Sequence, residues 1–76
     1  MHRYVVSCNL YLATDPTKPR FTEVVMQALD PVVARLMALE HVRVAHRFVG
    51  IDRIEDATTI RVPDSQPGVI LMKVSE

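Results

Sequence analysis

The sequence predicts a small α+β domain, in which one long helix covers one face of a four-stranded, mostly antiparallel sheet in the order β-α-β-β-β. Three patterns predict it: strict alternation of apolar residues near the N-terminus, an apolar stripe at helical spacing in the middle, and β-branched runs towards the C-terminus. With 76 residues, 49% hydrophobic and 24% charged, the composition is that of a globular chain. We therefore expect residues 1–76 to form a single domain with a thin core.

The first strand is expected at the N-terminus, where every second residue is apolar: Tyr4, Val6, Cys8, Leu10 and Leu12. Such a period of two places these side chains on one face, towards a core. Residues 14–19 contain Pro16 and Pro19 and predict an irregular loop after this strand.

A helix is expected from about Thr22 to about Glu40, because apolar residues recur at steps of three and four: Phe21, Val24, Val25, Ala28, Leu29, Val32, Val33 and Leu36. The pair Asp30–Pro31 lies inside this stripe and leaves two interpretations open. A new helix can start there, with Asp30 as N-cap and Pro31 at the first position, or one helix can bend at Pro31. Because the stripe keeps its phase across Pro31, we favour one curved, Pro-kinked helix.

Three further strands are expected over residues 42–51, 58–62 and 69–74, separated by a polar connection at 52–56 and a turn at 63–68. A complete ferredoxin-like fold would need a second helix before the last strand, and residues 63–68 are too few to supply one.

One helix can cover only one face of the expected sheet, and the other face still carries apolar residues among arginines. An apolar surface with a polar surround is typical of an interface, so we expect a homodimer or a tight heteromeric partner. Pairing through an exposed edge strand is an equal alternative, and single exposed aliphatic residues can also be ordinary surface. The residues predicted to bind a partner are Tyr11, Arg43, Arg47, Val49, Arg61 and Leu71.

The sequence predicts no catalytic, cofactor-binding or metal-binding residues. Cys8 is the only cysteine, and His41 and His46 are five residues apart, which does not match the spacing of a zinc site. The carboxylates lie in expected loops or at the ends of the expected helix, where nothing raises their pKa values for acid/base work. Only two glycines are present, Gly50 and Gly68, which excludes glycine-rich phosphate loops.

These observations favour a non-enzymatic protein-interaction module, such as a small regulator, inhibitor or adaptor. We expect a cytoplasmic location, because a single cysteine permits no internal disulfide, and no membrane, because no apolar run approaches the ~20 residues of a membrane span. The first alternative is a nucleic-acid-binding sheet domain that uses Arg43, Arg47, Arg61, Lys73 and Tyr11, although the formal net charge is zero. The second alternative is a minor subunit of a larger enzyme complex.

Overall fold

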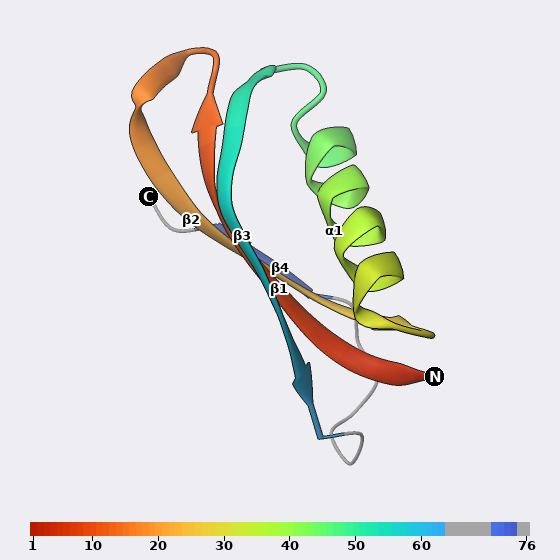
Figure 1. Cartoon of the computed structure of the whole chain (residues 1–76). Coiled ribbons are helices and arrows are strands. Elements are labelled where there is room, and N and C mark those ends of the chain that lie inside the picture. The colour runs from red at the N-terminus through yellow and green to blue at the C-terminus, as the bar shows by residue number, and fades with distance from the viewer. Residues whose placement is uncertain (64–70, 75–76) are drawn as a thin grey trace.

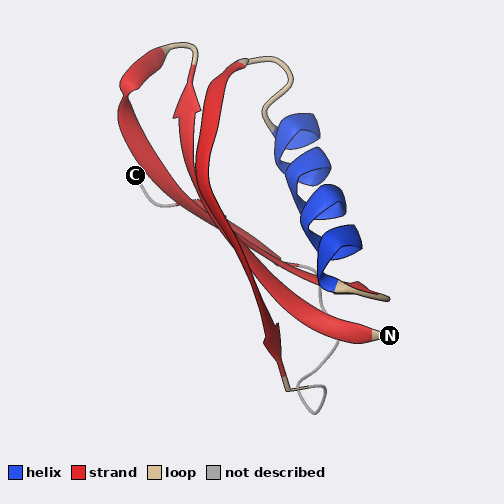
Figure 2. Cartoon of the chain, viewed as in Figure 1, coloured by secondary structure: helices blue, strands red, loops and turns tan. Residues whose placement is uncertain are grey.

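The computed structural model describes residues 1–63 and the backbone of residues 71–74. The elements in chain order are β1 (His2–Leu12), β2 (Asp15–Ala28), α1 (Pro31–Ala45), β3 (Ile51–Val62) and β4 (Leu71–Val74). Strands β3, β1 and β2 form an antiparallel sheet, β4 pairs with the outer edge of β2, and α1 lies on one face of the sheet (Figures 1 and 2). The expected α+β class, with an antiparallel sheet and one helix, is confirmed.

Strands β1 and β2 form a hairpin closed by two residues, Ala13 and Thr14. In its register Tyr4 opposes Met26 and Val6 opposes Val24, so the buried residues of both strands share one face. Residues 16–19, which include both prolines, have no partner in the β1 register, because the pairing is irregular between Leu10 and Leu12. The missing N–H groups of Pro16 and Pro19 therefore cost no ladder hydrogen bonds there.

The prediction of one helix from Thr22 to Glu40 is wrong, because residues 15–28 form β2 and the helix starts at Pro31. The alternative start is the one that the structure adopts: Asp30 is extended, with φ −151° and ψ 167°, and its side chain accepts a hydrogen bond from the backbone N–H of Val33 at 2.9 Å. Proline disfavours the helical conformation in the preceding residue but fits the first helical position well. Pro31 thus begins α1 instead of bending a longer helix.

The strand expected over residues 42–51 is also wrong. Residues 42–45 complete α1, and the chain then turns through residues 46–49. The turn is closed at His46, whose carbonyl accepts hydrogen bonds from the N–H groups of Val49 at 3.2 Å and Gly50 at 2.8 Å. Gly50 has φ +86°, a conformation that glycine adopts without strain. The element order is consequently β-β-α-β-β and not the expected β-α-β-β-β.

Strand β3 is longer than expected, because it includes the residues assigned to a polar connection at 52–56. Its pairing with β1 shifts between Ser7 and Asn9, and the bulge contains Asp56 at φ +56°. Asn9 Nδ2 donates to the Asp56 carboxylate at 3.0 Å, which fixes the bulge. Of the last expected strand, residues 71–74 pair with Thr22–Val25 of β2; residues 69–70, and the expected turn from residue 64 onward, lie outside the described residues.

The core lies between α1 and the sheet. Its buried members come from both central strands and the helix: Tyr4, Val6, Leu10, Leu12, Val24, Met26, Ala28, Ala34, Ala38 and Val42. The burial predicted for the first strand is confirmed, since its alternating apolar residues from Tyr4 to Leu12 are all buried.

Candidate interaction surface

Helix α1 turns its smallest apolar side chains towards the sheet. Ala34 and Ala38 are fully buried, and Val42, one further turn along, is 1% exposed. This i, i+4, i+8 spacing lies along one side of a helix and brings the helix backbone close to the sheet. The larger apolar side chains of α1 have consequently been left on its other sides.

We call these exposed side chains, with two neighbours beyond the ends of α1, the outer helix surface: Leu29, Val32, Val33, Leu36, Met37, Val44 and Phe48. Leu36 is 63% exposed and Phe48 is 90% exposed. A surface helix normally shows polar residues on the side away from its core. An apolar surface of this extent is typical of a place where another molecule binds.

A groove runs beside the outer helix surface where α1 meets the end of β2. It has a volume of about 480 Å³, and its lining is mostly apolar: Met26, Leu36 and Met37, with Glu40 and His41. Met26 itself is buried in the core, so the groove reaches from the solvent to the edge of the core.

Two opposite charges lie beside these apolar residues, on the solvent-exposed side of α1. Glu40 and Arg43 are both exposed and three residues apart. Within the described part of the chain, neither has an ion-pair partner. The exposed side of α1 therefore carries a carboxylate at Glu40 and a guanidinium at Arg43, and neither is neutralised by an ion pair within the described residues.

The structure does not bring the six predicted partner-binding residues onto one sheet face. Arg43 lies on α1, and Arg47 and Val49 lie in the turn that follows it, so the placement of these three on a strand is wrong. Arg61 is on β3 but opposes Tyr4, which puts it on the helix side of the sheet, away from Tyr11. Leu71 opposes Val25 at the β2 edge.

Tyr11, the remaining predicted residue, lies on the helix-free face of the sheet and is half-buried. The guanidinium of Arg53, which opposes Tyr11 across the strands, lies 3.8 Å from the centre of its ring. This contact occupies one face of the Tyr11 ring.

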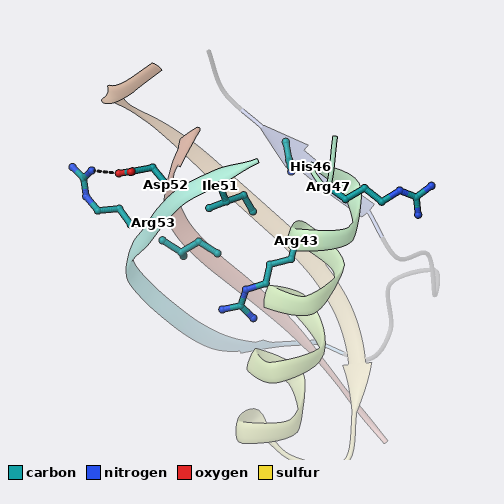
Figure 3. A pocket seen from close by; sticks show the side chains of 7 residues that line it. Arg43, His46, Arg47, Ile51, Asp52 and Arg53 are labelled. Carbon is teal, nitrogen blue, oxygen red and sulfur yellow. Dashed lines mark hydrogen bonds and ion pairs between the residues drawn. The ribbon is translucent and has the colours of Figure 1, made fainter. Parts of the chain in front are cut away.

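A second hollow, of about 430 Å³, separates the C-terminal turns of α1 from the start of β3 (Figure 3). Its rim carries Arg43, Arg47, Asp52 and Arg53, and Ile51 and Ile54 lie at the side of the core. In Figure 3 the guanidinium groups of Arg43 and Arg47 point in different directions, so they do not converge on one anion.

Arg53, on the same rim, is already engaged. Its guanidinium donates to the carboxylates of Glu55 and Asp52, to the latter at 2.6 Å, and to the carbonyl of Pro16 at 3.2 Å. The hydrogen bonds to Glu55 and then to Asp52 raise the pKa of Arg53 above its ordinary range. Because these are exposed contacts, we count them as positioning the β3 start and not as a source of much stability.

Other chemistry-bearing groups are dispersed. Cys8 is buried in β1, and burial raises the pKa of its thiol, which lowers its reactivity.

His46 Nδ1 lies 2.9 Å from the carbonyl of Val42, so this nitrogen carries the proton and donates to the end of α1. Among the residues whose placement is described, no group of three His, Cys, Asp or Glu side chains could hold a metal ion, and no helix is long and apolar enough to cross a membrane.

The chain matches no protein-family model, no curated protein and no solved structure. Its function must be inferred from the geometry above, in which the outer helix surface is the feature that the fold itself leaves unexplained.

Sequence reasoning missed this surface. It placed Leu36 on the sheet side of a helix and Phe48 on the core side of a strand. The signal that could have found it is the small-residue stripe Ala34, Ala38 and Val42, which marks the inward side of α1 and leaves Leu36 outside.

Proposed function

We propose that this protein is a non-enzymatic interaction module that forms a homodimer through the outer helix surface. As a small regulator, inhibitor or adaptor, it would present its helix-free sheet face, where Phe21 is 46% and Ile60 is 61% exposed, to a further protein partner. The proposal includes a cytoplasmic location, because one buried cysteine leaves no internal disulfide to maintain. The observation that carries the proposal is the orientation of α1, which buries the small side chains of Ala34 and Ala38 against the sheet and exposes the larger side chain of Leu36 to the solvent.

The apolar area available on α1 is enough to support weak self-association. Five of its apolar side chains, Val32, Val33, Leu36, Met37 and Val44, are between 36% and 67% exposed. At ~1.5–3 kcal/mol for full burial of such a side chain, covering them in both copies is worth roughly 8–16 kcal/mol. Association costs about 4–15 kcal/mol in lost freedom of motion. Because the two terms are of similar size, we expect a weak dimer whose fraction rises with protein concentration.

The charges favour a second copy as the occupant of this surface. A two-fold axis brings the same patch of two chains together, so every contact is made twice. Glu40 of one copy can then meet Arg43 of the other, and the reciprocal pair forms at the same time. The described part of the chain supplies no ion-pair partner for either charge, and Arg35 on the same helix has none either.

Sedimentation velocity over protein concentrations from the micromolar to the millimolar range tests the proposal. The wild-type chain should show a concentration-dependent dimer, and Leu36→Glu should be monomeric throughout, because the dimer would have to bury its carboxylate. The matched control is Ile60→Glu, which introduces the same charge at a side chain of nearly equal exposure, 61% against 63%, on the helix-free face.

Far-ultraviolet circular dichroism must show that both variants retain the fold. Dimerisation of wild type and of Ile60→Glu, but not of Leu36→Glu, supports the proposal. A wild-type chain that stays monomeric at all concentrations contradicts it, as does a dimer that Ile60→Glu disrupts and Leu36→Glu does not.

A further inference from the structure

Phe48 is held in an exposed position that its own chain does not explain. It is 90% exposed, in the turn that follows α1. The turn is fixed by the hydrogen bond from Gly50 to His46 at 2.8 Å and by that from Ala13 to Gly50 at 3.1 Å. The guanidinium carbon of Arg47 lies 4.7 Å from the ring centre. A large aromatic side chain presented on a fixed turn is typical of an interface anchor.

The groove between α1 and β2 has the chemistry to receive this ring. Its apolar lining consists of Met26, Met37 and Leu36, and thioether sulfurs make favourable contacts with aromatic rings. The groove is shallow and open to the solvent, so a phenyl ring can lie against these side chains. From Met37 to the end of α1 at Ala45 the helix rises about 12 Å, and Phe48 lies three residues further along the chain, in the turn. The ring that enters the groove must therefore come from another chain.

One antiparallel arrangement of the two α1 helices allows both the contact of Phe48 with the groove and the ion pairs between Glu40 and Arg43. If Glu40 of one copy lies opposite Arg43 of the second copy, Ala45, the last residue of α1, lies level with Ala38 of the second copy. Phe48 follows three residues later in the turn, which brings it to the part of the second helix that carries Leu36 and Met37 of the groove. The ion pairs and the aromatic contact are thus compatible with a single two-fold axis.

From this coincidence we propose that, in the homodimer, Phe48 of each chain inserts into the groove of the other chain, beside Met37 and Met26, with reciprocal ion pairs between Glu40 and Arg43. This inference rests on the proposed function and specifies how the same surface recognises its second copy. Closure of both contacts around one axis limits the assembly to a dimer.

Sedimentation equilibrium of Phe48→Ala tests the insertion, with Phe21→Ala as the matched control on the helix-free face. We expect the dimer dissociation constant of Phe48→Ala to rise about tenfold or more, as for truncation of an interface anchor, and that of Phe21→Ala to stay unchanged. In a double-mutant cycle, Phe48→Ala and Met37→Ala together should weaken the dimer by less than the product of their separate effects, because they remove one shared contact.

The register has its own test in charge reversal. Glu40→Arg alone should weaken the dimer because it faces Arg43 of the second copy, and Glu40→Arg combined with Arg43→Glu should restore it. Restoration supports the register; failure of the double reversal to recover the dimer overturns it.

The outcomes separate this inference from the proposed function. If Leu36→Glu abolishes the dimer while Phe48→Ala leaves its dissociation constant unchanged, the homodimer stands and the insertion of Phe48 is wrong. If Leu36→Glu also leaves the dimer intact, the outer helix surface is not the interface and both proposals fail.

Discussion

Replacing Ala38 with leucine perturbs the feature on which the proposed interface depends, the close approach of α1 to the sheet. Ala38 is fully buried and belongs to the cluster that contains Val6, Leu10 and Val24, all of them at most 2% exposed. If small side chains face the sheet because the space is narrow, a larger side chain at this position has nowhere to go.

The size of the effect follows from two opposed terms. Leucine adds three carbon atoms, which would gain about 2 kcal/mol at ~0.8 kcal/mol per methylene if they were simply buried. Overpacking a filled core instead costs a net ~1–3 kcal/mol, because side chains leave their preferred rotamers and the backbone shifts. For 76 residues, total stability should be about 4–11 kcal/mol, so this loss is a large fraction of it. The melting temperature should fall by about 4 °C or more.

Urea unfolding followed by circular dichroism measures the change, at several protein concentrations so that the contribution of dimerisation is separated. The control is the same substitution at an exposed position of the same helix, Ala45→Leu, which should change the free energy of unfolding by no more than about 0.5 kcal/mol. A neutral or stabilising Ala38→Leu would refute the reasoning, because it would mean that the space between α1 and the sheet is not filled.

Substitutions at three further positions test local features of the fold. Asp30→Ala should cost about 1 kcal/mol by removing the cap on the N–H of Val33, and Asp30→Ser should recover most of it in the same urea titration. Gly50→Ala should lower the free energy of unfolding by about 1 kcal/mol, because alanine is strained at a φ of +86°. The added carbon would not clash, since it would lie 3.5 Å from the Ala13 side chain, an ordinary contact. An unchanged free energy of unfolding would contradict the assigned conformation. Because burial raises the pKa of Cys8 in the folded chain, the unfolded chain releases this proton first, so the free energy of unfolding should fall as the pH rises above about 9. That fall should be weaker in Cys8→Ala.

The strand β1 could be predicted from the sequence, because its apolar residues recur with the period of two that is typical of a strand and do not fit the period of a helix. Tyr4, Val6, Cys8 and Leu10 stand at every second position, and all four are buried; of the residues between them Ser7 and Asn9 are polar and only Val5 is apolar. The α+β class followed from this alternation together with a helical stripe. The number and position of the other strands could not be predicted in this way, because the sequence of β2 fits both the period of two of a strand and the 3.6-residue period of a helix.

Residues 21–29 contain both patterns. Thr22, Val24, Met26 and Ala28 alternate as in a strand, and these are the buried residues. The set that includes Phe21, Val25 and Leu29 fits a helix equally well. The hairpin pairing with β1 decides between them, because it aligns the alternating set with Val6 and its neighbours. Tertiary pairing of this kind is not visible in the local pattern.

The same ambiguity hid the candidate interface. Read as a strand, residues 42–48 put Val44 and Phe48 inside; read as the end of a helix that starts at Pro31, they put both outside. Once the helix start is known, the inward side is set by Ala34, Ala38 and Val42, and the larger side chains must face away. Among the residues whose side chains are described, most of the exposed large apolar ones lie on α1 or next to its ends, and not on the second face of the sheet, where the sequence had predicted an apolar surplus. A second chain that covers the outer helix surface must contact α1. Because Leu36 and Phe48 are exposed, substitutions there should change the dimer dissociation constant while they change the free energy of unfolding of the single chain little.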